Sequence, residues 1–294
     1  MRFTKMHGAG NDFVVLDAVE QPLGIAPEDL PGLVYRLCDR HTGVGADGVM
    51  VLQASATGAD VAMRFYNSDG SLGEMCGNGA RCVCRYACEC GYAGDTVRVE
   101  TTAGLVTGWR QSRDRFRIRL NTPTVLEAER VLTLDGETYC CGYAELGNPG
   151  IPHLTVEIPD LLLRIDDEEA LGALRMLGRK LRYHPALPKG ANVNFYQVTG
   201  PQQLRQLTYE RGVEDFTLAC GTGAGSLAAV LTASGRMDGA NVQVQTAGGD
   251  LDVEIEMEAG RVENLYLTGA ALIVYSGELA EEFLQPVVIE DIMD

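Results

Sequence analysis

Cys76-Gly77-Asn78-Gly79 recurs 144 residues later as Cys220-Gly221-Thr222-Gly223, in a chain of 294 residues. After each cysteine, small and apolar residues recur at helical spacing, and a glycine, Gly91 or Gly235, follows fifteen residues on. Glycine ends helices readily because it accepts the left-handed backbone conformation at little steric cost. The repeat therefore predicts two helices that each begin at a cysteine.

The repeat extends into the flanking strands. Short β patterns at 64–67 and 206–210 precede the cysteine loops, and alternating patterns at 96–102 and 241–246 follow the helices. Both later strands end in Thr-Ala-Gly. Because strand, cysteine loop, helix and strand occur twice in the same order, we predict an α/β protein of two pseudo-symmetric domains.

Length and composition narrow the class of protein. A chain of 294 residues suits two domains of about 100 to 200 residues. Lys and Arg number 24 against 41 Asp and Glu, a formal net charge of -17, which repels phosphate backbones and anionic lipids. No apolar run reaches about 18 residues, and the first residues lack a signal-peptide pattern. We expect a soluble, cytoplasmic protein that binds neither nucleic acid nor membranes.

Seven of the nine cysteines lie outside the repeated loops. Zinc sites usually draw paired ligands from two separated segments, and an odd number of cysteines does not suit a disulfide framework. We therefore predict no metal site and interpret these residues as small apolar side chains that pack in the interior. They are Cys82, Cys84, Cys88 and Cys90 on the first predicted helix, with Cys38, Cys140 and Cys141 elsewhere.

The position of the two repeated cysteines predicts their chemistry. A thiol at the first turn of a helix meets unpaired N–H groups and the positive end of the helix dipole, which lower its pKa from about 8.5. The same N–H groups can hold a carboxylate. Two such thiols on opposite faces of one carbon could remove a proton and return another, which is a two-base racemase or epimerase reaction that needs no cofactor.

Three motifs resemble one family. The run from Asn67-Ser68-Asp69-Gly70-Ser71 to Glu74-Met75-Cys76-Gly77-Asn78-Gly79-Ala80-Arg81-Cys82 is similar to the signature of diaminopimelate epimerases. His7-Gly8-Ala9-Gly10-Asn11-Asp12-Phe13 resembles their N-terminal motif, and Glu210-Arg211-Gly212 with Ala219-Cys220-Gly221-Thr222-Gly223 resembles their second-cysteine motif. The motifs stand in the family's order and span most of the chain.

The resemblance implies roles for individual residues. Cys76 and Cys220 would be the catalytic acid and base, and His153 would support them. Arg211 suits a carboxylate and Glu210 an ammonium group. The implied substrate-binding residues are Asn11, Asn67, Gly77, Asn78, Asn192, Glu210, Arg211, Gly221 and Thr222.

The resemblance also implies an architecture. Each domain would be a curled, mostly antiparallel sheet wrapped around a central helix. Residues 1–121 with 269–294 would form the domain that carries Cys76, and 122–268 the domain that carries Cys220, since the last strand, near 271–276, would return to the first domain. The resemblance further implies a homodimer.

Departures from the family pattern leave the substrate open. In Gly147-Asn148-Pro149-Gly150-Ile151-Pro152-His153, either Asn148 or Ile151 could occupy the position that contacts the distal end of the substrate. Gly48 stands where some members have glutamine, and Phe216 stands in a loop where we expect a polar residue. We expect epimerisation of LL- to meso-diaminopimelate, a step toward lysine and peptidoglycan precursors. A racemase of another amino acid such as histidine is the alternative.

Other motifs predict less. Gly43-x-Gly45-x-x-Gly48 matches a dinucleotide-binding pattern, but helix-like residues precede it and strand-like residues follow it, the reverse of a Rossmann loop. A thiol-redox protein would explain Cys76 and Cys220, yet it leaves Asn11, Asn67 and the pair at 210–211 without a purpose.

Overall fold

The computed structural model describes residues 1–73 and 76–285 of the chain. These form two compact units. Unit 1 comprises Met1–Gly8, Asp12–Gly108 and the segment from Ala271, and unit 2 comprises Ala9–Asn11 and Trp109–Ala270.

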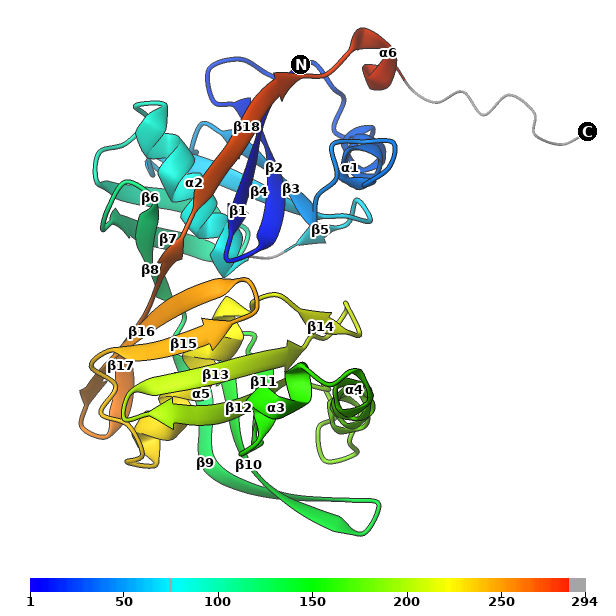
Figure 1. Ribbon diagram of the computed structural model, residues 1–294. Helices are drawn as coiled ribbons and strands as arrows, with labels where there is room; N and C mark the ends of the chain where they lie inside the picture. The colour runs from blue at the N-terminus through cyan, green and yellow to red at the C-terminus, as the bar shows by residue number, and fades with distance from the viewer. Residues whose placement is uncertain (74–75, 286–294) are drawn as a thin grey trace, which may run out of the picture. The chain divides into compact units, whose positions relative to one another are not determined.

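Unit 1 is a mixed sheet with the helices α1 (Leu30–Cys38) and α2 (Gly77–Glu89) on opposite faces (Figure 1). β1 pairs antiparallel with β18 and also pairs with β2, β2 runs parallel to β3, β3 is antiparallel to β4, and β4 runs parallel to β6. Its elements are β1 (Arg2–Gly8), β2 (Asn11–Ala18), α1 (Leu30–Cys38), β3 (Gly48–Gln53), β4 (Val61–Asn67), β5 (Leu72–Gly73), α2 (Gly77–Glu89), β6 (Thr96–Thr101), the start of β7 (Gly104–Arg110), β18 (Leu272–Glu278) and α6 (Glu281–Leu284).

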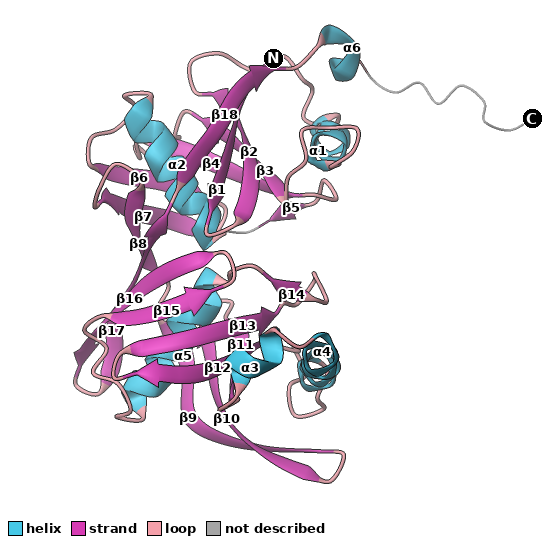
Figure 2. Ribbon diagram, in the orientation of Figure 1, coloured by secondary structure: helices cyan, strands magenta, loops and turns pink. Residues whose placement is uncertain are grey.

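Unit 2 repeats this plan with a larger sheet, which encloses α5 in Figure 2. β10 is antiparallel to β9 and β11, β11 runs parallel to β12, β12 is antiparallel to β13, and β13 runs parallel to β15. The sheet continues antiparallel through β16 and β17 to β8. Its elements are β8 (Arg115–Leu120), β9 (Pro123–Leu134), β10 (Glu137–Leu146), β11 (Ile151–Glu157), α3 (Leu161–Ile165), α4 (Glu168–Arg182), β12 (Asn192–Gly200), β13 (Gln203–Tyr209), β14 (Phe216–Thr217), α5 (Gly221–Ala233), β15 (Val242–Thr246), β16 (Gly249–Glu258) and β17 (Arg261–Ala270).

The two units share one order of elements. In unit 1, α1 links the parallel strands β2 and β3, and α2 links the parallel strands β4 and β6. In unit 2, α3 and α4 link β11 and β12, and α5 links β13 and β15. The prediction of two pseudo-symmetric α/β repeats, each a curled sheet around a central helix, is confirmed.

Both central helices end as predicted. Gly91 and Gly235 have positive φ angles of 77° and 71°. In α2 the N–H of Tyr92 donates to the carbonyl of Ala87, and in α5 the N–H of Arg236 donates to that of Leu231. A glycine in the left-handed region followed by this longer hydrogen bond is the Schellman ending, which satisfies the last carbonyls of each helix.

The outer helices cover a second apolar layer on each sheet. In unit 1, α1 packs Leu33, Val34 and Leu37 against Val14 and Leu16 of β2. In unit 2 the equivalent cluster joins α3 and α4 to β10, β11, β12 and β13. Each sheet is therefore buried on both faces, which fixes the side on which every strand residue lies.

The segment that ends unit 1 includes β18, which lies in the predicted region near 271–276. β18 pairs with β1, as in the predicted return of the chain to the first domain. Residues 109–121, expected in that domain, belong to unit 2, because β8 pairs with β17 along its whole length. The domain boundaries near 121 and 268 remain predictions.

Two of the seven further cysteines lie at the surface, against expectation. Cys90 follows the last turn of α2 and Cys140 lies on β10, and both are exposed. Helical and strand spacing set the direction of these two side chains, and none of the residues that the structure describes covers them. Cys38, Cys82, Cys84 and Cys141 are buried and Cys88 is half-buried.

At 15 residues, α4 is the longest helix in the part of the chain that the structure describes, and none of the helices there is a candidate membrane span.

Candidate active site

The two cysteines occupy the same position in α2 and α5. Cys76 is the N-cap of α2 with φ −125° and ψ 118°, and Cys220 is the N-cap of α5 with φ −115° and ψ 105°. The carbonyl of each accepts the first bond of its helix, from Ala80 at 2.8 Å and from Ala224 at 2.9 Å. The backbone N–H groups of the following three residues have no acceptor within the helix, so both first turns suit an anion.

The third residue of each helix is a glycine in close contact with the sheet. A Cβ built on Gly79 would lie 1.8 Å from Cε of Met50, and one built on Gly223 would lie 2.2 Å from Oδ1 of Asn194. Real Cβ atoms do not approach so closely, so a side chain at either position would force the residue on the sheet to move. The first turns differ in what supports them, a methionine in unit 1 and an amide in unit 2.

Unit 2 brings three of the predicted residues together. His153 and Asn192 are register partners on the parallel strands β11 and β12. The Oδ1 of Asn192 accepts from the backbone N–H of Arg211 at 2.8 Å, and a guanidinium nitrogen of Arg211 lies 3.5 Å from the carbonyl of Lys189. The loop that carries Arg211 is thus tied to the start of β12.

His153 is completely buried on β11. Burial, together with the nearby charge of Arg211, lowers the pKa of His153 to about 3, so the ring is neutral. Its Nδ1 lies 3.3 Å from the amide nitrogen of Asn194, and its Nε2 has no hydrogen-bond partner within residues 1–73 and 76–285. Since Nδ1 accepts from Asn194, we assign the ring proton to Nε2.

The carboxylate of Glu210 is held by the hydroxyl of Thr217, which donates to Oε2 at 2.9 Å. Between these residues the chain makes a loop in which the N–H of Glu210 donates to the carbonyl of Asp215 at 3.0 Å. α4 anchors the loop through Arg175, which donates to Asp215 at 2.6 Å. Thr217 and Arg175 carried no signal in the sequence, because neither lies in a recognisable motif.

Phe216 is the unexpected apolar residue of this loop, and its contacts explain why it is there. Its ring makes edge contacts with Phe195 and Tyr209, with centroids 6.3 and 6.0 Å apart. Both partners belong to the buried cluster under α4, which Phe216 joins from the side. The side chain is therefore an anchor for the loop, which accounts for an apolar residue where we expected a polar one.

Unit 1 supplies two predicted asparagines, Asn67 and Asn78. Asn67, the last residue of β4, donates from Nδ2 to the hydroxyl of Ser71 at 3.0 Å. Asn78, in the first turn of α2, accepts from the guanidinium of Arg81 at 2.8 Å. Arg81 is fully buried, and its place in the motif gave no indication of this contact.

Asn11 begins β2, and its segment packs in unit 2. A Cβ on Gly10 would lie 2.9 Å from the side chain of Leu218 and 3.1 Å from the backbone of Gly248. Leu218 stands two residues before Cys220, and its carbonyl accepts from the N–H of Gly248 at 2.8 Å. The structure therefore brings the Asn11 segment to the loop of the second cysteine.

Ion pairs hold Asp12, the residue that follows Asn11. Asp12 accepts from Lys5 at 2.6 Å and from Arg40 at 2.8 Å, and Arg40 also pairs with Asp47. Burial by itself would raise the pKa of Asp12, but the hydrogen bonds from Arg40 and Lys5 lower it to about 2. Sequence reasoning missed this network because its members are distant in the chain.

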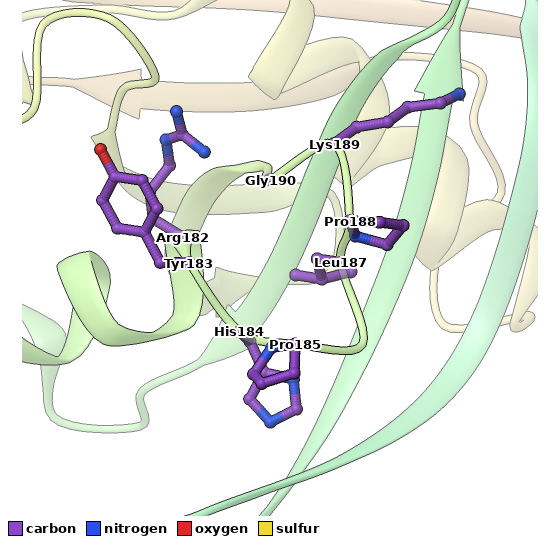
Figure 3. Close-up of a pocket in the computed structure, with 8 residues that line it drawn as sticks. All are labelled: Arg182, Tyr183, His184, Pro185, Leu187, Pro188, Lys189 and Gly190. Atoms are coloured by element: carbon purple, nitrogen blue, oxygen red, sulfur yellow. The ribbon is translucent and has the colours of Figure 1, made fainter.

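A separate hollow is lined by the end of α4 and by the loop that links α4 to β12 (Figure 3). It measures about 350 Å³, and none of the predicted site residues lines it. Its lining residues are Arg182, Tyr183, His184, Pro185, Leu187, Pro188, Lys189 and Gly190.

The whole chain is similar to one family of enzymes. The model of the diaminopimelate epimerase family matches residues 3–124 and 147–274. The diaminopimelate epimerase of Archaeoglobus fulgidus is 40% identical over 288 residues, which cover 94% of this chain and 95% of that protein. The diaminopimelate epimerase of Aquifex aeolicus is 38% identical over 296 residues, which cover 97% of this chain and 100% of that protein.

The chain belongs to the diaminopimelate epimerase family.

Solved structures agree on the fold. A probable proline racemase from Agrobacterium radiobacter K84 has a TM-score of 0.68 at 20% identity, covering 95% of this chain and 93% of that chain. A hydroxyproline epimerase from Agrobacterium vitis has a TM-score of 0.68 at 20% identity, covering 94% and 91%. At this identity the likeness concerns the fold alone. The family resemblance predicted from the motifs is confirmed, and the roles of the individual residues remain predictions.

Proposed function

We propose that this protein is a diaminopimelate epimerase that interconverts LL- and meso-diaminopimelate without a cofactor. The observation that carries the proposal is the pair of thiols at equivalent N-caps, in a chain that belongs to the family along most of its length. One thiolate takes the α-proton, and the other thiol gives a proton to the opposite face of the same carbon. The thiolate becomes a thiol and the thiol becomes a thiolate. The substrate therefore loses one proton and gains one, and no net proton is taken up from solution.

The first turns of α2 and α5 would bind the substrate carboxylate at the reacting carbon. The backbone of Gly77 and Gly221, with the amide of Asn78 and the hydroxyl of Thr222, offers the donors. Charge-assisted bonds to these groups would stabilise the carboxylate as negative charge develops on the adjacent carbon.

The remaining polar groups would hold the rest of the substrate. Arg211 suits the distal carboxylate and Glu210 an ammonium group, with amides from Asn11, Asn67 and Asn192. Their supports favour these roles, because Thr217 orients the carboxylate of Glu210 and Asn192 holds the backbone of Arg211. His153, neutral and buried, would support the second thiol.

Ile151 rather than Asn148 would occupy the position that contacts the distal end of the substrate. Ile151 is the first residue of β11 and shares a face with His153, two residues on. Asn148 is exposed in the turn that precedes the strand. An apolar side chain would then stand where a hydrogen-bonding residue is common in the family.

We further propose that the enzyme supplies meso-diaminopimelate for lysine and peptidoglycan precursors in the cytoplasm, as a homodimer. Its substrate is a small amino acid, and the family membership supports this pathway. Sedimentation of the purified protein would test the oligomeric state.

Isotope exchange tests the reaction. The purified, reduced protein is incubated in deuterated water with LL-diaminopimelate, L-lysine and L-histidine separately, and a variant with both cysteines changed to alanine is the control. We expect α-deuterium and the meso isomer only with diaminopimelate, and none with the control. Incorporation into histidine instead would favour the alternative racemase, and no incorporation into any amino acid would refute the epimerase proposal.

A further inference from the structure

A saturated amide lies under the first turn of α5. Asn194 is completely buried, and its Oδ1 accepts from Nε2 of Gln206 and from the hydroxyl of Thr208, each at 3.0 Å. Its Nδ2 donates to the carbonyl of Leu154 at 3.1 Å and lies 3.3 Å from Nδ1 of His153. An asparagine amide has two acceptor sites and two donor hydrogens, and all four are used here.

The same amide is locked in place. Gln206 and Thr208 are themselves buried, and Nε2 of Gln206 donates to the hydroxyl of Thr208 at 2.9 Å. Rotation of the Asn194 amide would leave buried donors without partners, at a high desolvation cost. Its oxygen is therefore a fixed point in the sheet.

The backbone of α5 rests directly on this point. A Cβ on Gly223 would lie 2.2 Å from Oδ1 of Asn194 and 2.8 Å from Nε2 of Gln206, so only a glycine leaves room. Gly223 and Cys220 belong to the same helical turn, which closes through the bond from Ala224 to the Cys220 carbonyl. A displacement of Gly223 would move the thiol with it.

We propose that Asn194 is a positioning residue that sets the Cys220 thiol through Gly223, without touching the substrate. The proposal rests on the epimerase function, in which Cys220 is one of the two bases. A thiol displaced by about 1 Å from its carbon costs on the order of 100-fold in rate. The same turn carries Gly221 and Thr222, the proposed donors to the substrate carboxylate, so KM changes together with kcat. The reactivity of the Cys220 thiol is therefore the measurement that reports its positioning separately from substrate binding.

The matched control is Thr155. It lies opposite Asn194 in the register of β11 and β12, is equally buried, and its hydroxyl has no hydrogen-bond partner among the described residues. Thr155→Val removes one polar atom from the same row while keeping the shape. Because no bond is lost, we expect kcat within about two-fold of wild type.

The experiment compares Asn194→Leu with Thr155→Val by kcat, KM and the alkylation rate of Cys220. Iodoacetamide labelling is followed by peptide mapping, with Cys76 as the internal reference, so the positioning of Cys220 is measured whether or not diaminopimelate is the substrate. We expect Asn194→Leu to lower kcat about 100-fold, with a rise in KM, and to change the alkylation rate of Cys220 but not of Cys76. Wild-type kcat and alkylation in Asn194→Leu, or an equal loss in Thr155→Val, would overturn the proposal.

A double-mutant cycle covers the case in which Asn194→Leu fails to fold, and separates the contact with Gly223 from the contact with His153. Gly223→Ala drives a methyl group into the space of the Asn194 oxygen, and Asn194→Ala vacates that space. If the two residues act through one contact, the kcat of the double variant should be about ten-fold or more above the value obtained by multiplying the two single losses. Multiplicative effects would refute the direct coupling.

Discussion

α2 and α5 have the same length and begin at cysteines of nearly the same backbone conformation, yet their surroundings differ. α2 carries two buried arginines, Arg81 and Arg85. The equivalent positions in α5, 144 residues on, are Gly225 and Ala229. The arginines of unit 1 belong to the helix, whereas the buried amide against which Gly223 packs in unit 2 belongs to the sheet.

The two sheets also differ in the side chain on which the first turn of each central helix rests. Gly79 of α2 rests on the thioether of Met50, and Gly223 of α5 rests on the hydrogen-bonded amide of Asn194. A thioether adapts its shape at low cost, while a saturated amide keeps one orientation. The repeat thus preserves the backbone and the thiol, and it leaves each half to support them by different means.

The thiols themselves are where the two halves should be most alike. We expect Cys76→Ala and Cys220→Ala each to reduce the interconversion of LL- and meso-diaminopimelate by about 1,000-fold or more, because a general acid or base contributes about 10² to 10⁴ and the reaction needs both. Rates are measured by the isomer ratio over time, with circular dichroism to confirm folding. The exposed Cys90 changed to alanine is the control and should keep full activity. If one of the two variants stayed active, the halves would not be equivalent in function.

Acid should weaken unit 2 through His153. The pKa of this buried ring is lowered to about 3, while an unfolded histidine titrates near 6.5. Between these values the unfolded state binds a proton that the folded state does not, so the free energy of unfolding falls as the pH falls from about 6.5 toward 3. The loss reaches roughly 3 kcal/mol at pH 4.

Urea unfolding at several pH values measures this loss. His153→Gln should show a smaller decrease between pH 6.5 and pH 4 than wild type, because it lacks the titrating ring. Identical slopes in wild type and His153→Gln would show that the ring is protonated in the folded state.

The two supporting glycines offer a direct comparison of stability. Alanine at Gly223 forces its methyl group against an oxygen fixed by two hydrogen bonds, and we expect a loss of about 2–3 kcal/mol. Alanine at Gly79 meets the terminal methyl and the sulfur of Met50, the flexible end of that side chain, and the gain in helix propensity of about 1 kcal/mol offsets most of the strain. Chemical denaturation of both variants gives the difference. Equal losses would mean that Met50 is as rigid as Asn194.

The elements around the cysteines were predictable because their signals are local. Glycine at the end of each helix, apolar spacing within it and alternation in the next strand each depend on a few neighbouring residues, and the structure confirms them at Gly91 and Gly235. The dinucleotide-like pattern ending at Gly48 was correctly rejected for the same reason, since α1 precedes it and β3 follows it.

The supports of the site were not predictable, because they depend on contacts between distant segments. Asn194 is one polar residue in a strand pattern, and only the register with β13 shows that Thr208 faces it. Phe216 was unexpected in its loop until Phe195 and Tyr209 explained it. The exposure of Cys140 likewise follows from which layers cover each strand, which spacing within one strand does not reveal.

The ion pairs of Asp12 in unit 1 give the smallest predicted effect. Asp12 is held by Lys5 and Arg40, and its pKa is lowered from 3.8 to about 2. A carboxylate with a lowered pKa stabilises the folded state above about pH 4 and loses that contribution as the pH falls toward 2. We expect about 1–2 kcal/mol, lost over that window and reduced by salt only in part, because Lys5 is buried.

Asp12→Asn should remove this dependence below pH 4 and leave the slope caused by His153 between pH 6.5 and pH 4 intact. If Asp12→Asn also flattened the slope above pH 4, the two titrations would belong to one cooperative transition, and the acid sensitivities of units 1 and 2 would not be separable.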